Sequence, residues 1–404
     1  MNVVAAARTI VARLRENGFT AYFAGGCVRD QLLALPPTDV DVATDATPDQ
    51  IRRLFRRTKL VGAQFGVALV RVRGCEIEGA TFRTDGDYRD GRHPETVTFA
   101  TPEADAARRD FTINGMFLDP LDGTLIDHVG GRADLANRVI RCIGEPSRRF
   151  AEDHLRLLRA VRFAARLGFT IEPATSAAMK QHAPRLAAIS AERIHGELSL
   201  ILGHRHRGAG WRLIGAHGLA SHLIARFDWS AEQFARCAAV LEALPAEVSP
   251  ALALAAIFIG RDAEALRVAL RKLRTSVALS KAVIYVVSSA DEAVTRPDWE
   301  LADVKDLVAG GHGSDGLALA RARLTAEGGD ARAVDDLARR VAAVAPADAH
   351  PEPWITGEDL IALQLPPGPR FREILDAVYR RQLNEVVTTR AQALACARKL
   401  AELN

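Results

Sequence analysis

The sequence predicts an α+β protein in which an α/β head is followed by an all-helical region. Short apolar runs of strand length alternate with helical segments over the first 140 residues. After about residue 145 the hydrophobic period becomes that of helices, with leucines and arginines on opposite faces. Between residues 208 and 345 the chain is rich in alanine, the residue with the highest helix propensity.

Length and composition restrict the function. The chain has 404 residues, enough for two to four domains. Its net charge is only +3, so any contact with nucleic acid must use local basic patches. The five cysteines are scattered without paired spacing, which argues against disulfides and structural zinc and fits a reducing cytoplasm. No segment is long and apolar enough to span a bilayer, so we expect a cytoplasmic protein.

The head begins with a helix over residues 1–17, which Asn17-Gly18 would end. A strand over 19–24 then leads into Gly25-Gly26, and we expect a short helix over 30–35. Strands over 67–72 and 76–82 would pair around a turn.

A polar, glycine-containing loop follows from residue 83 to 94, and its composition is typical of a mobile segment. Later helices are expected over 152–167 and 190–202, and 345–353 is interpreted as a linker.

The clearest chemical pattern combines a glycine pair with two carboxylates. Asp39 and Asp41 alternate as strand residues do, so both would project from one face as oxygen ligands for divalent metal ions. The turn at Gly25-Gly26 offers backbone N–H groups, and Arg29 adds a charged donor for phosphate. Together they suggest a nucleoside triphosphate site.

A third carboxylate would strengthen this site. Glu78 stands on a strand that could return to the same sheet, but Glu76 lies two residues away on the same face. The choice between them is open at this stage, as is the simpler interpretation of a solvent-facing strand residue.

A second pattern lies in the helical region. Asp153 and Arg156 are spaced i, i+3 and are expected on one helical face. The simple interpretation is an intrahelical ion pair. The functional one is a protein template, since a carboxylate accepts from the amino group of cytosine or adenine while the arginine donates to the adjacent ring acceptor. Arg159 and Arg162 continue this face.

Five motifs occur in one order along the chain: Gly25–Asp30, Asp39–Asp41, Arg108–Met116, Glu152–Arg159 and Glu192–Leu198. They resemble the successive motifs of the bacterial-type (class II) tRNA nucleotidyltransferases, the CCA-adding enzymes, and of their bacterial poly(A) polymerase relatives. The resemblance is strong over residues 19–202 and weaker in the C-terminal segments 356–360 and 366–370.

The resemblance implies a polymerase-β-like nucleotidyltransferase head with a mixed sheet over residues 1–140. It implies a helical neck over 141–205 that recognises the base, a helical body over 206–345 that binds RNA, and a helical tail over 346–404 that binds tRNA. Its partners would be tRNA, CTP and ATP, with no membrane and no obligatory protein partner.

The same resemblance assigns roles to single residues. Asp39 and Asp41 would bind two Mg²⁺ ions. Glu78 is added as a candidate third catalytic carboxylate from its strand position, not from the resemblance. Nucleotide would be bound by Gly26, Arg29, Arg109, Asp153, Arg156, Arg159 and Arg162. The expected reaction is two-metal transfer of a nucleotidyl group to the tRNA 3′-hydroxyl with release of pyrophosphate.

Two alternatives to CCA addition remain, a poly(A) polymerase and a catalytically silent RNA-binding relative. The loop from Asp85 to Pro94 resembles the flexible loop of enzymes that add all three nucleotides, which favours CCA addition. Candidate RNA-binding residues are Arg267, Arg271, Lys272 and Arg274 in the body and Arg370 and Arg372 in the tail. We expect Arg267, Arg271 and Arg274 to form one helical stripe. Gln364 stands where the family resemblance would place a glycine.

Overall fold

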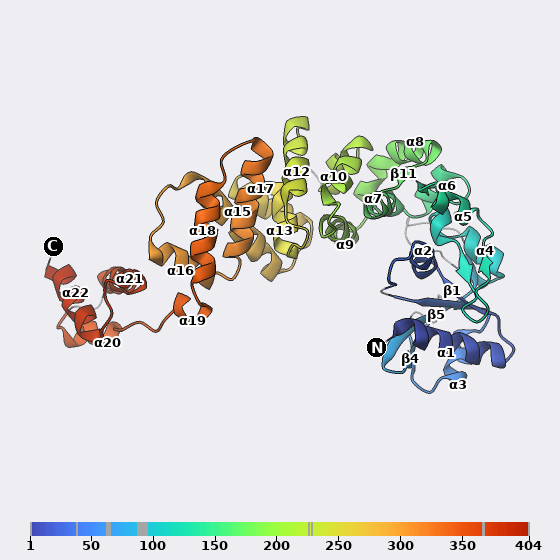
Figure 1. Cartoon of the computed structure of the whole chain (residues 1–404), viewed down its shortest axis with the longest axis horizontal. Coiled ribbons are helices and arrows are strands. Elements are labelled where there is room, and N and C mark those ends of the chain that lie inside the picture. Colours follow the sequence, from blue (N-terminus) through green and yellow to red (C-terminus); the bar gives the residue numbers. More distant parts are fainter. Residues whose placement is uncertain are drawn as a thin grey trace. The chain divides into compact units, whose positions relative to one another are not determined.

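The computed structural model describes residues 2–37, 39–61, 66–86, 96–224, 227, 229–365 and 368–402. The chain divides into two compact units, residues 1–201 with 209–228 and residues 202–208 with 229–404 (Figure 1). Most of the loop expected to be mobile, from residue 87 to 94, lies outside the described residues. Among the helices described, none combines the length and apolar character needed to cross a bilayer.

The first unit is built on a seven-stranded sheet with the order β3-β4-β5-β2-β1-β8-β9. Strands β2 and β5 pair in parallel and their other neighbours are antiparallel, so the sheet is mixed. The strands are β1 (Ala21–Ala24), β2 (Asp41–Thr44), β3 (Thr58–Leu60), β4 (Val67–Val72), β5 (Cys75–Thr81), β8 (Phe117–Leu118) and β9 (Leu125–Ile126). Smaller sheets pair β6 (Arg83–Asp85) with β7 (Val97–Phe99) and β10 (Val139–Ile140) with β11 (Thr170–Ile171).

Helices cover both faces of this sheet. Figure 1 shows α1 (Val3–Glu16) and α3 (Pro48–Leu54) on one face and α2 (Gly26–Leu32) on the other. Helix α1 buries Ala6, Ile10 and Leu14 against the strands, the spacing that predicted an amphipathic helix. The expected helix over 30–35 was placed too late, because Gly25 takes φ +73° and α2 begins directly at Gly26.

The rest of the first unit is mostly helical. Its helices are α4 (Pro102–Ala107), α5 (Gly131–Ala136), α6 (Pro146–Glu152), α7 (Arg156–Leu167), α8 (Pro173–His182), α9 (Ala191–Leu202), α10 (Arg207–Ala216) and α11 (Ala220–Leu223), with short 3₁₀ turns η2 (Thr112–Asn114) and η3 (Ala183–Ala188). The helix expected over 152–167 is present as α7 but starts later, at Arg156, since the chain breaks between α6 and α7 with Asp153 extended.

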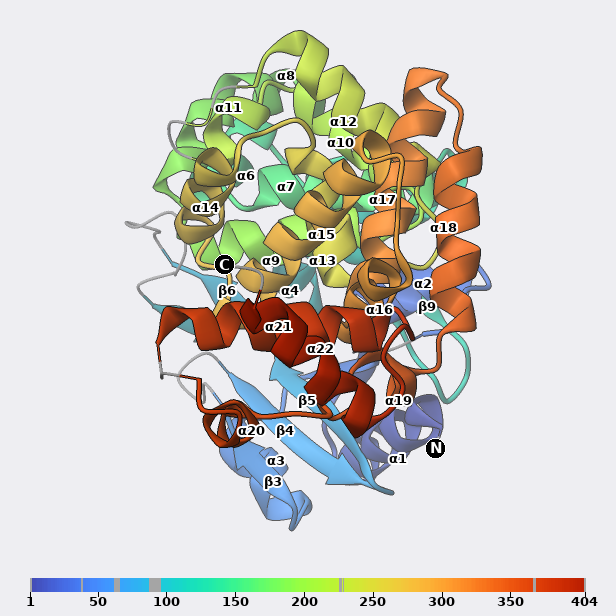
Figure 2. The same cartoon turned by 90° about the vertical axis from the view of Figure 1, so that its left-hand side faces the viewer.

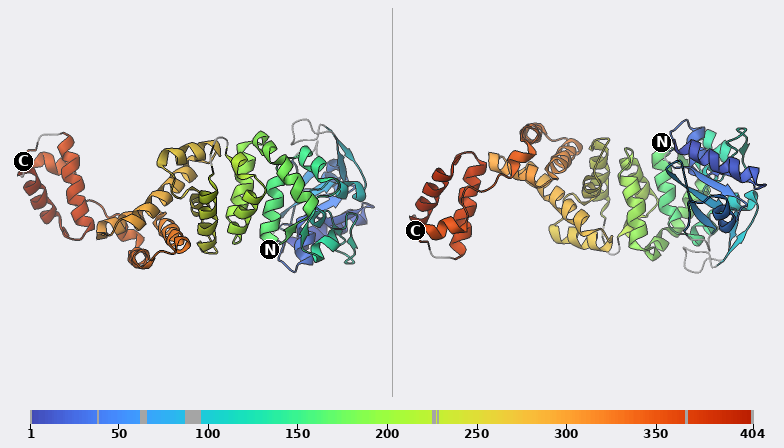
Figure 3. Two further views of the ribbon diagram at one scale, coloured as in Figure 1. Left: turned by 90° about the horizontal axis from the view of Figure 1, so that it is seen from above. Right: turned by 90° about the horizontal axis from the view of Figure 1, so that it is seen from below.

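The second unit is helical throughout its described residues (Figures 2 and 3). It contains α12 (Ala231–Ala243), α13 (Pro250–Ala255), η4 (Ala256–Phe258), α14 (Ala263–Lys272), α15 (Val277–Thr295), α16 (Leu301–Ala309), α17 (Gly313–Glu327), α18 (Arg332–Ala343), α19 (Pro346–Ala349), α20 (Gly357–Ala362), α21 (Pro369–Leu383) and α22 (Arg390–Glu402). The segment interpreted as a linker therefore contains one short helix, α19. Near the end of the chain, Ile374, Val378 and Ala393 belong to a separate apolar core.

Candidate active site

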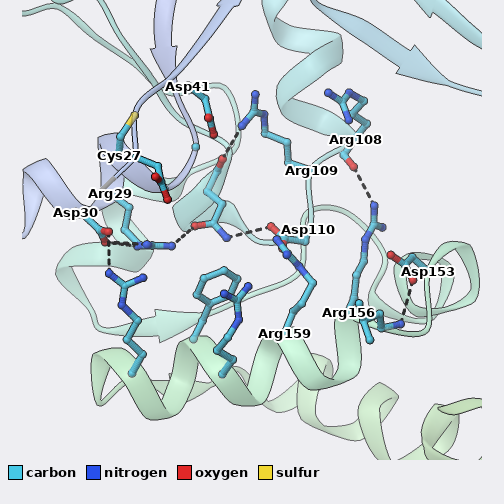
Figure 4. A pocket seen from close by; sticks show the side chains of 18 of the residues that line it. Cys27, Arg29, Asp30, Asp41, Arg108, Arg109, Asp110, Asp153, Arg156 and Arg159 are labelled. Atoms are coloured by element: carbon cyan, nitrogen blue, oxygen red, sulfur yellow. Dashed lines mark hydrogen bonds and ion pairs between the residues drawn. The ribbon is translucent and has the colours of Figure 1, made fainter. Parts of the chain in front are cut away.

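One cavity of about 480 Å³ in the first unit brings most of the expected site residues together (Figure 4). It lies between the β1–α2 turn, the residues before β2, the segment around η2, and α7. Its lining consists of Gly25, Gly26, Cys27, Arg29, Asp30, Asp39, Asp41, Arg108, Arg109, Asp110, Asn114, Asp153, Leu155, Arg156, Arg159, Arg162, Phe163, Arg166 and Arg193.

The carboxylate end of the cavity is formed where β2 begins. Val40 is buried while Asp39 and Asp41 are exposed, so the expected alternation is present even though the strand proper starts only at Asp41. Both carboxylates line the cavity. Residue Asp41 stands opposite Ala24 on β1, which places it beside the turn at Gly25.

The charge around Asp41 fits a divalent cation. Burial, together with the negative charges of Glu78 and Asp39, raises the pKa of Asp41 to about 6, and the positive charge of Arg109 opposes this rise. Such a cluster of carboxylates is stabilised by a cation. Among the described residues, no group of three or more His, Cys, Asp and Glu side chains is arranged as a complete metal cage. One or two carboxylates completed by substrate phosphates are the usual protein site for Mg²⁺.

The structure separates the two candidates for the third carboxylate. Val42 pairs with Gly79 in the parallel register, which brings the neighbouring Glu78 close enough to perturb Asp41. Glu76 instead lies 4.0 Å from the Nζ atom of Lys59. Of the two, Glu78 alone is positioned to act with Asp41, although it does not line the cavity.

Arg29 is held rigidly beside the Gly25-Gly26 turn, where we expected phosphate to bind. Its side chain is 2% exposed, and its guanidinium donates to Asp30 Oδ1 at 2.8 Å and to Asn114 Oδ1 at 2.6 Å. Burial lowers its pKa, an effect that Asp30 opposes. Because Gly25 has no side chain, the Nη1 atom of Arg109 can approach this turn, where an added Cβ would lie 3.0 Å away.

Arg109 is oriented by two contacts. It donates to Asp105 Oδ2 at 2.9 and 3.1 Å, and its guanidinium lies 5.1 Å from the centre of the Phe117 ring. Asp105 is almost fully buried and also pairs with Arg108 at 2.7 Å. These contacts hold the guanidinium of Arg109 in a fixed orientation where it lines the cavity.

The expected base-reading pair lines the cavity, but not as one helical face. Asp153 follows the last residue of α6, and its Oδ1 accepts from the backbone N–H of Leu155 at 3.0 Å. This local bond competes with helix formation and explains the break. Asp153 pairs with Arg193 at 2.9 Å, whereas Arg156 pairs with Glu152 at 2.9 Å. The simple interpretation of an ion pair between Asp153 and Arg156 is therefore wrong.

Arg159 and Arg162 lie further along α7. Arg159 donates to Asp110 Oδ2 at 2.6 and 2.8 Å. Burial alone would raise the pKa of Asp110, but Arg159 and Asn114 outweigh it and bring the pKa to about 2. Arg162 lies 2.9 Å from Glu197, whose pKa is raised by burial.

Hydrogen bonds connect the two ends of the cavity. Asn114 accepts from Arg29 and donates to Asp110 Oδ1 at 3.1 Å, while the other oxygen of Asp110 accepts from Arg159. Figure 4 shows Arg29, Asp110 and Arg159 along this path, with Asp153 and Arg156 at its far end. Arg29, the expected phosphate donor, is thus connected through hydrogen bonds to Arg159, which lies nearer the expected base-reading pair.

Phe163 packs against three of these guanidiniums. The Cζ atoms of Arg29, Arg159 and Arg162 lie 5.0, 5.4 and 4.5 Å from its ring centre. The ring is 5% exposed and meets Phe111 edge-on at 5.9 Å. One buried aromatic side chain therefore organises donors from both ends of the cavity.

Sequence reasoning missed several residues that hold the site together. Asp110 and Asn114 occur within a motif that was recognised, but no role followed from their positions alone. Arg193 and Glu197 lie in the Glu192–Leu198 motif, and only the packing of α9 beside α7 reveals their partners. Arg166 could have been found, since it extends the helical spacing of the α7 arginines.

The candidate RNA-binding residues lie in the second unit. Arg267 and Arg271 lie on α14, within 3.8 and 3.6 Å of Glu264, and Lys272 is the last residue of that helix. The predicted three-arginine stripe is wrong, because α14 ends before buried Leu273 and Arg274 adopts a left-handed conformation with φ +54°.

The two tail candidates are positioned differently. Arg370 donates to the backbone carbonyl of Ala401 at 2.8 Å, and exposed Arg372 lies 3.7 Å from Asp376.

Comparison with known proteins gives matches along the whole chain. Residues 21–141 match the family model described as the poly A polymerase head domain. Residues 168–228 match the model described as a probable RNA and SrmB-binding site of polymerase A.

Related sequences and solved structures also match CCA-adding enzymes. The CCA-adding enzyme of Limosilactobacillus fermentum is 35% identical over 383 residues, which cover 93% of this chain and 91% of that protein. The CCA-adding enzyme of Geobacillus stearothermophilus is 45% identical over 215 residues, which cover 53% of this chain and 53% of that protein. The crystal structure of the Bacillus stearothermophilus CCA-adding enzyme in complex with CTP superposes with a TM-score of 0.82 at 30% identity, covering 100% of this chain and 99% of that one.

Proposed function

The chain belongs to the family of CCA-adding enzymes, and from this premise we propose that it adds C, C and A to tRNA 3′ ends. The predicted family and the polymerase-β-like nucleotidyltransferase fold are confirmed. The proposed substrates are CTP, ATP and a tRNA, and pyrophosphate is released. The observation that carries the proposal is one cavity with a carboxylate pair at one end and the base-reading residues at the other.

Nucleotidyl transfer in this family needs a divalent metal, and we propose Mg²⁺. Asp39 and Asp41 would hold it, and Glu78 would act beside them. When bound, the metal supplies charge for the reacting phosphate and acidity for the attacking hydroxyl. The pKa of Asp41, raised to about 6 by burial and by the neighbouring carboxylates, supports this role, since a bound cation would relieve their repulsion.

The residues of this chain would position the nucleotide. Gly26 begins α2 beside the phosphates, and Arg29 and Arg109 would neutralise their charge from fixed positions. Such a transfer requires positioning and charge stabilisation more than a side-chain base. The arginines are already oriented by Asp30, Asn114 and Asp105, so little reorganisation would be needed on binding.

Base choice would come from Asp153 and Arg156 without a nucleic-acid template. A carboxylate has lone pairs enough to accept from Arg193 and from an amino group together. Arg156 uses its Nη1 and Nη2 groups for Glu152 and two backbone carbonyls, which leaves its Nε–H and one Nη2 hydrogen for a ring acceptor. Cytosine and adenine present the matching amino donor and ring acceptor, whereas guanine and uracil do not. Arg159 and Arg162 would support this end.

A direct experiment is nucleotide addition to a tRNA that lacks its terminal CCA. The protein is incubated with this tRNA, Mg²⁺ and each NTP alone or in mixtures, and the products are sequenced. Addition of two cytidines and one adenosine supports the proposal. Asp39→Ala should abolish addition while tRNA binding stays largely intact. As a matched control, Asp49→Ala removes an exposed carboxylate on α3 that pairs with neighbouring Arg52, outside the cavity lining, and should leave addition unchanged.

The match to a poly A polymerase head domain supports a second candidate, poly(A) addition to general RNA. Its signature in the same experiment is a long homopolymeric A tail on tRNA and on unrelated RNA. The absence of any product, with RNA binding retained, would instead support a silent RNA-binding relative.

A further inference from the structure

Arg166 stands in the last turn of α7 at the phosphate end of the cavity, and the roles proposed above do not use it. It lines the cavity with about a third of its side chain exposed. Its Nη2 donates to Asp30 Oδ2 at 2.9 Å. The other oxygen of Asp30 accepts from Arg29. One carboxylate therefore holds two guanidiniums side by side.

The charges at this end are unbalanced. Arg29 and Arg166 share Asp30, and Arg162 faces Glu197, so these three guanidiniums have two carboxylate partners. Asp39 and Asp41 also line this end of the cavity, where the metal ion would balance their charge. Asp30 is only 5% exposed and is pinned between its two partners. Holding like charges close together is unfavourable, as the lowering of the Arg29 pKa first by burial and then by Arg166 reflects. A polyanion bound at this end would remove the imbalance.

The position of Arg166 indicates which part of the nucleotide it would meet. Arg156 opens α7 at the base end and Arg166 lies ten residues later, about 15 Å along the helix axis. A nucleotide with its base beside Arg156 would extend its phosphates toward Gly25 and Arg29. Arg166 shares Asp30 with Arg29, so it lies at the end of the cavity where the terminal phosphates would be bound.

We propose that Arg166, held by Asp30, is a binding residue for the β,γ-diphosphate of the incoming nucleotide and for the pyrophosphate that leaves. The inference rests on the proposed function for its substrate. A guanidinium suits this ligand because its planar donors match phosphate oxygens in pairs. Asp30 would keep the guanidinium oriented in the cavity.

The test measures pyrophosphate binding directly. Inorganic pyrophosphate is titrated calorimetrically into the full chain with Mg²⁺ and no RNA. Arg166→Gln should weaken its affinity about tenfold or more, the effect of removing a hydrogen bond to a charged group. Arg166→Lys should lose less affinity than Arg166→Gln, because lysine keeps the positive charge but lacks the planar set of paired donors. The control Arg141→Gln alters an arginine that also pairs with a carboxylate, Asp134, but lies outside the cavity lining, and it should bind pyrophosphate normally.

Steady-state kinetics add a readout that a merely structural role would not give. In Arg166→Gln the KM for CTP and for ATP should rise by the same factor, and inhibition by pyrophosphate should weaken in parallel. Base selection should stay unchanged. Unaltered pyrophosphate affinity in both Arg166 variants, or a change in KM for only one nucleotide, would overturn the proposal. If Arg166→Gln does not fold, the pyrophosphate affinity of Arg166→Lys tests the proposal instead.

The two proposals fail in different ways. A wild-type protein that binds pyrophosphate through Arg166 but adds nothing to tRNA contradicts the proposed function alone. A wild-type protein that adds CCA, with Arg166→Gln binding pyrophosphate as tightly as the wild type, contradicts the inference alone.

Discussion

Replacing Asp41 with asparagine should stabilise the metal-free protein while abolishing nucleotide addition. The pKa of Asp41 rises from 3.8 to about 6 in the folded protein. That shift corresponds to about 3 kcal/mol of unfavourable charge in a closed site. Because the side chain is exposed at the cavity, solvent screening reduces the expected effect to about 1 kcal/mol. In a unit of this size the midpoint of thermal unfolding should rise by about 2–4 °C.

The pH dependence of this effect has a definite sign. The folded-state pKa lies above the unfolded one, so the wild type is most stable, with respect to this group, below pH 3.8 and loses that stability as the pH rises through about 6. The asparagine variant does not titrate there. Its advantage over the wild type should be complete at pH 8 and should be smaller at pH 4.5, where more of the folded wild-type carboxyl is protonated.

Thermal unfolding of both proteins in EDTA, at pH 8 and pH 4.5, measures this difference. Saturating Mg²⁺ at pH 8 should then stabilise the wild type and have little effect on Asp41→Asn. Asp49→Asn, on the exposed face of α3, is the matched control and should show neither change. An asparagine variant that is no more stable than the wild type at pH 8 without metal would refute the reasoning.

Two further predictions concern the contacts that connect the ends of the cavity. Asn114→Ala removes the bonds to Arg29 and Asp110 and leaves buried charge unsatisfied, so stability should fall by about 2 kcal/mol. The KM for CTP and the KM for ATP should rise together. Denaturant unfolding measures the loss of stability and steady-state kinetics measure KM; an unchanged KM would argue that these hydrogen bonds do not connect the two ends of the cavity. Phe163→Leu keeps most of the apolar volume but removes the ring beneath three guanidiniums, each contact contributing about 0.5–1 kcal/mol. Nucleotide affinity should fall about tenfold in a fluorescence titration, and full affinity would contradict the role given to the ring.

The carboxylate end could be predicted from the sequence because its pattern is local. Alternation around buried Val40 was enough to put Asp39 and Asp41 on one face. The choice of Glu78 over Glu76 could not be made this way. It depends on the register between β2 and β5, whose residues are far apart in the chain.

The base-reading end was predicted less well, for a physical reason. Helical spacing assumed a continuous helix, but the carboxylate of Asp153 bonds to the Leu155 N–H and interrupts it. Its partner Arg193 lies forty residues later, and no short-range pattern joins the two. Both residues line the cavity, but they do not form the expected pair, and their role in reading the base stays a prediction.

The second unit contains two positions where the structure can be compared with the sequence-based expectation. Gln364, where the family resemblance led us to expect glycine, takes a left-handed conformation with φ +60°, which glycine adopts at lower cost. The arginine stripe on α14 failed because periodicity does not show where a helix stops; Leu273 is buried and ends it before Arg274.

The central claim is that protein side chains select the base, and Asp153→Ala tests it most directly. The variant is incubated with a tRNA lacking CCA and a single nucleotide, which is CTP, GTP or UTP. The rate at which each nucleotide is added is then compared with the wild-type rate. Loss of one good base contact should raise GTP and UTP use relative to CTP about 10- to 100-fold, with a smaller change in triphosphate affinity. Continued exclusion of GTP and UTP would contradict the account.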